Sequence, residues 1–228
     1  MKTGRRQPRR HRSDESPGGA RGPAADYYSV HYRAYHAETF HVDPTPFLEP
    51  FARRLRPGSR VLDVGCGSGR DLAWLRRRGF KAIGFERSPG LAELARRETG
   101  GEVIVGDFTR FDFASLVVDA LLMCGALVHV PHADLPHVIG RILPAITPLP
   151  SPLNDCGRAT DDRGPVYISL KAGRGRHVDR HGRIFYLWSD AVLRGLFKEL
   201  GLAVIHFSRG PSAVGGNRNW LGYVLRID

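Results

Sequence analysis

The segment VLDVGCGSGRD, from Val61 to Asp71, decides the fold that we expect for this chain of 228 residues. It overlaps a short apolar run, Arg60–Val64, that reads as a buried strand. Glycines then alternate with other residues at positions 65, 67 and 69. Glycine lets the main chain turn sharply and lets a ligand approach the backbone N–H groups at the start of a helix. The segment therefore predicts a strand, a ligand-binding loop and a helix in direct succession.

Two acidic residues follow at the ends of the next two predicted strands. Glu86 closes the strand Lys81–Glu86, where a carboxylate can accept both hydroxyls of a ribose. Asp107 follows the strand Val103–Val105, where it can accept from an adenine amine while Phe108 covers the ring. Because the carboxyl ends of parallel strands form the ligand-binding crevice of open α/β sheets, we expect a nucleoside site at this edge.

Strand-like and helix-like segments alternate along the rest of the chain. Further predicted strands cover Asp119–Met123, Val166–Leu170, Ala203–Phe207 and Tyr223–Arg226. Predicted helices cover Thr45–Leu55, Asp71–Arg78, Pro89–Arg97, Ala133–Ile142 and Asp190–Leu200. This alternation is typical of an α/β domain with a parallel sheet.

We expect a disordered basic tail over residues 1–25 and one domain over residues 26–228. The tail is rich in Arg, Gly, Pro and Ser and lacks the large apolar residues that would offset the entropy cost of ordering it. Tyrosines at helical spacing predict a helical lid over residues 26–56. The proline-rich stretch 144–164 reads as an irregular insertion, either a surface excursion or a functional loop.

The net charge of +11 is concentrated in two places. Residues 1–23 carry +5 and residues 171–183 carry +4, which leaves +2 for the other 192 residues. A nucleic-acid partner held by residues 1–23 is one interpretation. Codon bias is the alternative, because 30 of the 34 basic residues are Arg.

No apolar segment is long enough for a membrane helix. The longest, Leu116–Val130, contains Asp119 and falls short of the ~18 uninterrupted apolar residues that a span needs. The three cysteines lack C-x-x-C spacing, which argues against disulfides and a zinc ribbon. The sequence shows no charged start followed by an apolar run and a cleavage site, so we do not expect secretion. We therefore expect a cytoplasmic protein without a metal site or a membrane partner.

These motifs resemble those of the class I S-adenosylmethionine-dependent methyltransferases, and most closely the small-molecule and tellurite-resistance-type branch. The resemblance runs from Tyr27 to the C-terminus and is carried by VLDVGCGSGRD, AIGFE, VGDF and DALLMCGALVHVP. It implies S-adenosyl-L-methionine as cofactor. It also implies a Rossmann-like seven-stranded sheet in the order 3-2-1-4-5-7-6, with the last strand antiparallel and helices on both faces.

The chain departs from the family's pattern at two points. The proline-rich stretch replaces the usual K-P-G-G turn before the fifth strand. The N-P-P-[YF] tetrapeptide of amino-group methylases is absent, and CGAL stands in its place. The second departure argues against methylation of a base amine of that type.

The resemblance also implies the residues that bind the cofactor. The glycines of the loop would face its methionine and ribose moieties, Glu86 the ribose hydroxyls, and Asp107 the adenine. The full expected set is Asp63, Gly65, Cys66, Gly67, Gly69, Glu86, Arg87, Asp107, Phe108, Cys124 and Gly125. Cys124 and Gly125 would lie beneath the sulfonium.

Methyl transfer from a sulfonium is an in-line displacement that depends chiefly on positioning. A general base is needed only where the acceptor carries a proton, and His129 is the candidate; a structural role in pinning its loop is the alternative. Candidates for the acceptor rim are Tyr27, Tyr35, Lys171, Arg174, Arg176 and Arg183.

The leading hypothesis is a methyltransferase for a small acceptor, for which an anionic group fits the basic rim. The alternatives are an RNA or tRNA methyltransferase tethered by its Arg-rich tail, and a cofactor-binding protein without turnover. A nicotinamide dehydrogenase is disfavoured because Arg70 occupies the last glycine position of the dinucleotide fingerprint.

Overall fold

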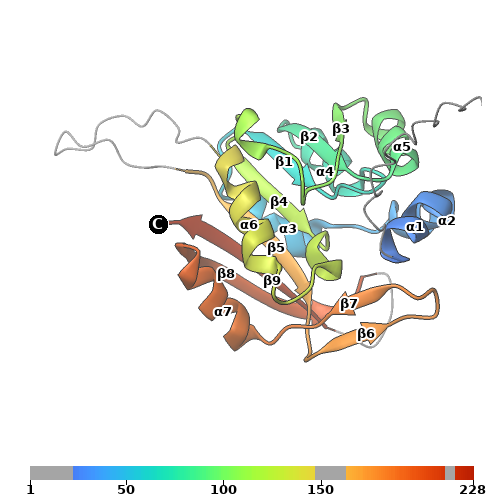
Figure 1. Cartoon of the computed structure of the whole chain (residues 1–228). Coiled ribbons are helices and arrows are strands. Elements are labelled where there is room, and N and C mark those ends of the chain that lie inside the picture. Colours follow the sequence, from blue (N-terminus) through green and yellow to red (C-terminus); the bar gives the residue numbers. More distant parts are fainter. Residues whose placement is uncertain (1–22, 147–162, 214–218) are drawn as a thin grey trace, which may run out of the picture.

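A seven-stranded sheet in the order β3-β2-β1-β4-β5-β9-β8 forms the centre of the molecule (Figure 1). The computed structural model describes residues 23–146, 163–213 and 219–228. The strands are β1 (Arg60–Val64), β2 (Lys81–Glu86), β3 (Val103–Val105), β4 (Ala120–Cys124), β5 (Val166–Lys171), β8 (Leu202–Pro211) and β9 (Asn219–Ile227). The first five are parallel, and β9 is antiparallel to both of its neighbours. The predicted order and the antiparallel last strand are confirmed.

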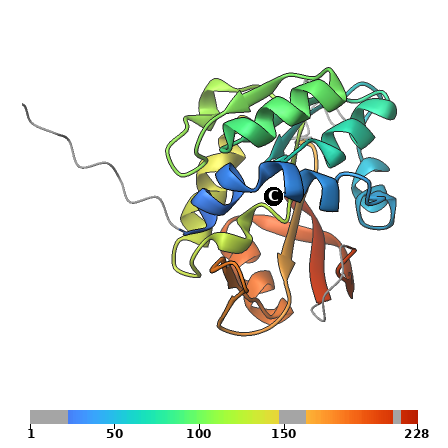
Figure 2. The ribbon, with the colours of Figure 1, turned by 90° about the vertical axis from the view of Figure 1, so that its right-hand side faces the viewer.

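Helices cover both faces of the sheet, and each face has its own apolar core. The helices are α1 (Pro23–Val30), α2 (Tyr32–Thr39), α3 (Thr45–Ala52), α4 (Arg70–Arg77), α5 (Pro89–Thr99), α6 (Leu135–Ile142) and α7 (Asp190–Glu199). Buried residues of α3, α4 and α5 form one core cluster, and those of α6 and α7 belong to the other. Helices α1 and α2 instead cross the carboxyl ends of the parallel strands, as Figure 2 shows.

Strand β1 shows why the sheet is central. Its residues Leu62 and Val64 belong to the core cluster of α6 and α7, whereas Val61 belongs to that of α3, α4 and α5. All three are fully buried. A strand buried on both faces is typical of parallel sheets, and each such side chain contributes roughly 1.5–3 kcal/mol of hydrophobic stabilisation.

Two boundary predictions are corrected. Helix α1 begins at Pro23, so residues 23–25 are helical, although we expected them to be disordered. Leu143–Ala145 forms a 3-10 turn and Ile146 bridges to Val118, so the first residues of the expected insertion are ordered. Residues 1–22 of the tail and residues 147–162 of the insertion lie outside the described residues. The hypothesis of an RNA partner tethered by the tail concerns residues 1–22 and stays a prediction.

The basic stretch 171–183 contains a hairpin that the sequence did not reveal. Strand β6 (Arg176–Val178) pairs antiparallel with β7 (Ile184–Tyr186), beyond the carboxyl end of β5. The strands have three residues each, too few for a clear alternation of polar and apolar side chains. In the part of the chain that is described, no helix has the length and apolar character needed to cross a membrane.

Gly84 of β2 tests the packing between β2 and the glycine loop. A Cβ at this position would lie 2.8 Å from the Cys66 Sγ and 3.1 Å from a Val103 methyl. We expect Gly84→Ala to lower the free energy of unfolding by about 1–3 kcal/mol, as overpacked cores do. Urea denaturation gives the value. The control is Gly140→Ala on α6, where nothing lies within 4 Å, and stability there is expected to hold or rise. Equal effects of the two substitutions would contradict the prediction.

Candidate active site

The carboxyl ends of β1, β2, β3 and β4 bring the expected cofactor residues to one edge of the sheet. The glycine loop follows β1, Glu86 ends β2, Asp107 follows β3 and Cys124 ends β4. Helices α1 and α2 lie across this edge (Figure 2). The structure therefore gathers these residues as the sequence predicted.

The loop after β1 depends on glycine at three positions. Gly65, Gly67 and Gly69 have φ angles of +73°, +57° and +90°, in the left-handed region that favours glycine. A Cβ at Gly65 would lie 2.6 Å from the Cβ of Ala126, and one at Gly67 would lie 3.4 Å from the ring of Tyr35. The bare backbone of the loop thus lies directly beneath a lid tyrosine.

Glu86 holds the loop in place. Its Oε2 accepts a hydrogen bond from the Gly67 N–H (3.0 Å) and its Oε1 accepts one from the Ser88 N–H (2.7 Å). The side chain is buried, and burial raises its pKa, whereas these backbone hydrogen bonds act to lower it. Each carboxylate oxygen keeps a second lone pair for another donor, such as a hydroxyl.

The Asp107 carboxylate forms hydrogen bonds within its own turn, at the edge of the site. Its Oδ1 accepts from the N–H (2.9 Å) and the hydroxyl (2.7 Å) of Thr109, and its Oδ2 lies 3.9 Å from the Arg87 Nη1. Partial burial acts to raise its pKa, but the Thr109 hydrogen bonds and Arg87 outweigh burial and lower the pKa. Phe108 is half-buried against the core cluster of α6 and α7.

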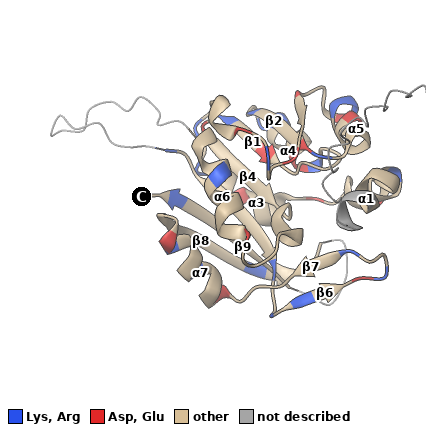
Figure 3. Ribbon diagram, viewed as in Figure 1, with Lys and Arg blue, Asp and Glu red and all other residues tan. Residues whose placement is uncertain are grey.

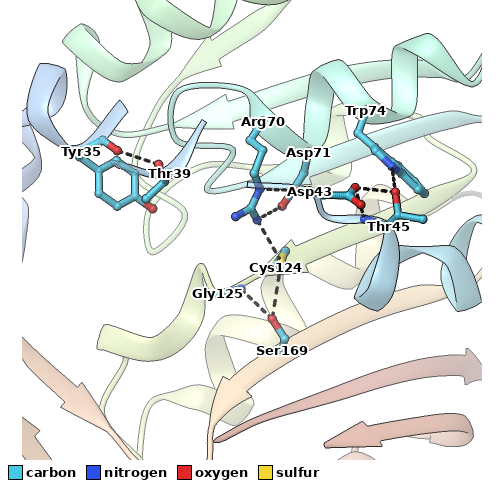
Figure 4. Close-up of polar contacts among 10 residues, drawn as sticks. All are labelled: Tyr35, Thr39, Asp43, Thr45, Arg70, Asp71, Trp74, Cys124, Gly125 and Ser169. Carbon is cyan, nitrogen blue, oxygen red and sulfur yellow. Dashed lines mark hydrogen bonds and ion pairs between the residues drawn. The ribbon is translucent and has the colours of Figure 1, made fainter. Parts of the chain in front are cut away.

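A buried charge cluster lies below the loop (Figure 4). Arg70 donates to both carboxylate oxygens of Asp71, at 2.7 and 2.8 Å, and its Nη2 lies 3.8 Å from the Cys124 Sγ. Asp63 is 2% exposed, and its Oδ2 has no hydrogen-bond partner among the described residues. Burial, followed by the charge of Asp71, raises the pKa of Asp63. The site therefore presents a buried acceptor that lacks a donor.

Ser169 of β5 links the ends of β4 and β5, and sequence reasoning missed it. Its hydroxyl accepts from the Gly125 N–H (3.0 Å) and donates to the Cys124 Sγ (3.7 Å) (Figure 4). Burial raises the pKa of the Cys124 thiol, so the thiol stays protonated and is a poor nucleophile. A Cβ at Gly125 would lie 3.2 Å from the Trp220 ring, which makes glycine necessary here too.

His129 connects the lid to the β6–β7 hairpin. Its Nδ1 lies 2.6 Å from the Ile184 carbonyl oxygen and its Nε2 lies 3.0 Å from the Tyr28 hydroxyl. Because a carbonyl only accepts, Nδ1 carries the hydrogen and Nε2 accepts from Tyr28. Burial lowers the pKa of His129 to about 4, so the ring is neutral at pH 7. This geometry is that of a loop-pinning residue, and a catalytic role for His129 stays a prediction.

Arg183 binds the lid from the other side. Its Nε pairs with the Asp179 Oδ2 at 2.7 Å, and its Nη1 donates to the Tyr28 hydroxyl at 3.4 Å. Its guanidinium carbon lies 4.1 Å from the centre of the Tyr27 ring. The predicted rim residues Tyr27 and Arg183 therefore lie together, and both His129 and Arg183 contact Tyr28, a further tyrosine of the expected lid.

The other predicted rim cations differ in their surroundings. The Lys171 Nζ lies 4.0 Å from the centre of the Phe185 ring and 5.5 Å from that of Trp220. Arg174 and Arg176 are exposed at the open end of the hairpin, where β6 begins. The structure thus brings both Lys171 and Arg183 to the ring of Phe185, since the Arg183 guanidinium also lies 5.3 Å from its centre.

Protonation of His129 supplies a pH test of the pinned lid. Its folded pKa of about 4 lies below the ordinary value of about 6.5, so acid favours the unfolded chain as the pH falls from about 6.5 to 4. We expect the stability advantage of the wild type over His129→Gln to shrink by about 2 kcal/mol between pH 7.5 and pH 5. Urea denaturation at both pH values measures it. A stability difference between the wild type and His129→Gln that does not change with pH would contradict the buried, neutral state assigned to His129.

Comparisons with known proteins agree with this arrangement. A family model described as a methyltransferase domain matches residues 61–148. The chain is 27% identical over 165 residues to "Probable fatty acid methyltransferase Rv3720" of Mycobacterium tuberculosis, covering 67% of this chain and 36% of that protein. It is 35% identical over 83 residues to the protein-L-isoaspartate O-methyltransferase of Methanoculleus marisnigri, covering 34% and 38%. The chain thus spans less than two fifths of the length of either relative.

A solved structure shares nearly the whole fold. It is the 1,6-didemethyltoxoflavin-N1-methyltransferase of Burkholderia thailandensis with bound 1,6-didemethyltoxoflavin and S-adenosylhomocysteine. The TM-score is 0.70 at 18% identity, over 94% of each chain. The strand order is that of the class I S-adenosylmethionine-dependent methyltransferase fold, and residues 61–148, which contain the glycine loop, match a methyltransferase domain.

Proposed function

We propose that this chain transfers a methyl group from S-adenosyl-L-methionine to a small acceptor that carries an anionic group. The observation that carries the proposal is the position of the β6–β7 hairpin. Its Phe185 ring lies against the Lys171 ammonium, and its Arg183 lies over the ring of Tyr27 in the lid. Another lid tyrosine, Tyr35, lies over Gly67 of the glycine loop.

The residues of the site fit the cofactor. The buried Asp63 Oδ2 lacks a donor among the described residues, and the ammonium group of the methionine moiety would supply one. The carboxylate of Glu86 keeps lone pairs for the ribose hydroxyls, and the backbone at Gly67 has no side chain to obstruct a ligand. The B. thailandensis enzyme, with the same fold, holds S-adenosylhomocysteine and a small substrate, which supports this reading.

The protein's contribution to the reaction is positioning. When bound, the cofactor supplies a methyl group on a positively charged sulfur, whose departure as a neutral thioether requires no acid. Tyr28 and Tyr35 lie edge to face, with ring centres 5.1 Å apart, and close the edge of the sheet against water. Their ring faces also favour a nearby cation. The lid would therefore hold the acceptor and the methyl group in line at near-contact distance.

The charge of the rim selects the acceptor. Residues 171–183 carry +4, and their single carboxylate, Asp179, is bound to Arg183. An ammonium beside an aromatic wall, such as Lys171 beside Phe185 and Trp220, suits a flat acceptor with a carboxylate or phosphate group. Neutral His129 would accept a proton only through Tyr28, which occupies its Nε2.

Cofactor binding is tested with a single methyl group at Gly67. We expect Gly67→Ala to weaken binding of S-adenosylhomocysteine roughly ten- to a hundredfold, because an added methyl in a close contact costs about 1–3 kcal/mol. Isothermal titration calorimetry gives the Kd. Gly201→Ala is the matched control, since Gly201 also has a positive φ (+68°) and a Cβ there would meet nothing within 4 Å. Equal Kd values for the two variants, or no binding by the wild type, would refute the cofactor assignment.

The acceptor class is tested at Lys171. Pooled carboxylate- and phosphate-bearing metabolites are screened with methyl-labelled donor by mass spectrometry, with neutral metabolites as a second pool. For the acceptor found, we expect Lys171→Gln to raise KM roughly tenfold or more, because a charge-assisted hydrogen bond is worth about 1.5–3 kcal/mol. The Kd of S-adenosylhomocysteine should not change. Lys198→Gln, at an exposed site on α7, is the control. Turnover of the neutral pool alone would refute the anionic acceptor, and no turnover with intact binding would indicate a binding protein.

A further inference from the structure

The edge of the sheet opposite the candidate active site carries a pocket lined with arginines. It has a volume of about 230 Å³ and lies where the chain enters β1, β4 and β5 and leaves β9. Four cations line it: Arg54, Arg56, Arg163 and Arg226. Leu55, Pro165 and Ile205 supply apolar wall, and Asp119 is its one carboxylate. In Figure 3 this edge is the one where β9 ends.

A second pocket, of about 460 Å³, continues along the same edge at the starts of β1 and β2. It is lined by three cations, Arg60, Arg76 and Lys81, and by Glu102. The two pockets adjoin, because the carbonyl of Ser59 in the first accepts from the N–H of Lys81 in the second at 2.9 Å. We call this adjoining pair of pockets the basic groove; its cations are Arg54, Arg56, Arg60, Arg76, Lys81, Arg163 and Arg226.

The positive charge of the basic groove is a local concentration. Its seven cations face Asp119, Glu102 and the nearby Asp228, which leaves +4. Among the described residues that line the two pockets, seven are cations and two are carboxylates.

Several residues of the groove also have structural contacts. Arg54 donates to the Pro50 carbonyl at the end of α3, and Arg76 lies in the last turn of α4, where cations favour the helix dipole. Arg226 pairs with Asp228 at 2.9 Å, although both side chains are more than half exposed, so this pair is worth little. Asp119 accepts from the Arg60 backbone N–H at 2.7 Å and is thereby committed to the strand.

We propose that the basic groove binds the sugar–phosphate backbone of a nucleic-acid strand. Strands lie about 4.8 Å apart, so a groove along β2, β1, β4 and β5 extends over about 15 Å, longer than a single phosphate and long enough for successive phosphates. The planar fork of arginine matches phosphate oxygens in pairs. The apolar side chains between the arginines offer surface for sugars and bases.

The basic groove would hold the nucleic-acid strand at a distance from the methyl-transfer site. Strand β1 has five residues, and at about 3.3 Å per residue it separates the two edges by about 15 Å. The nucleotides held in the groove are therefore not the ones at the methyl-transfer site. The proposal stands whether or not the chain transfers methyl groups.

The test measures binding of a fluorescein-labelled 12-nucleotide single-stranded RNA to the full chain by fluorescence anisotropy at several salt concentrations. The groove variant R54Q/R56Q/R226Q removes three exposed cations. The control variant R33Q/R97Q/R194Q removes three exposed arginines from α2, α5 and α7. Both variants lose the same charge, so a difference between them reports position and not net charge.

We expect the groove variant to bind at least roughly tenfold more weakly than the control variant. Its plot of log K against log salt should have a slope smaller by about two, because each phosphate contact to a single strand contributes about 0.7. Equal binding by the two variants and the wild type, or equal weakening of both variants, would overturn the proposal. Displacement of the RNA by inorganic phosphate at matched ionic strength would also overturn it, since a site for one phosphate would then suffice.

Folding and cofactor binding are checked in the same proteins. Circular dichroism and titration with S-adenosylhomocysteine should give the same results for both variants and the wild type. If the triple variant does not fold, Arg56→Glu alone replaces it, and unchanged RNA binding by that variant refutes the groove. Failure of the wild type to bind S-adenosylhomocysteine counts against the proposed function only, because RNA binding is measured without it.

Discussion

The hydrogen bonds from the Gly67 and Ser88 backbone to the Glu86 carboxylate are the constraint on which the site depends. A loop whose glycines adopt positive φ angles has few side chains with which to fix its own shape. The carboxylate at the end of β2 supplies the missing anchor and at the same time holds the start of α5. Because Glu86 is buried, its charge is tolerated only while these two N–H groups compensate it. Loop shape and carboxylate ionisation are therefore coupled.

The lid is held by contacts from several separate segments. Helix α1 has eight residues, and a helix of that length is not stable in isolation. Tyr28 fixes it: its carbonyl accepts from Ser88, and its hydroxyl contacts His129 and Arg183. Ser88 follows β2, His129 follows β4, and Arg183 belongs to the β6–β7 hairpin. The lid can thus be stable only when the sheet and the hairpin have formed, and closure of the acceptor side depends on the whole tertiary structure.

The sheet separates two basic regions with different chemistry. At the carboxyl edge, Lys171 and Arg183 lie against aromatic rings of the hairpin and the lid, where we propose that a small anionic acceptor binds. At the opposite edge, the basic groove is open and extended, and its arginines alternate with apolar side chains. Since about 15 Å of buried strand lies between them, each region can bind its own partner without competition.

The sequence by itself determined the glycine loop and the carboxylates at the ends of β2 and β3, because these follow from local pattern: apolar runs and glycine spacing. The strand order was implied by the family resemblance that these motifs carry. It could not determine the Arg70–Asp71–Cys124 cluster, the Ser169 link or the Tyr28–His129–Ile184 connection. Tyr28 and His129 are 101 residues apart and Cys124 and Ser169 are 45 apart, so no periodicity relates them. The β6–β7 strands are too short to leave a pattern. Tertiary structure decided these contacts, because only strand register and packing bring such distant side chains within hydrogen-bonding distance.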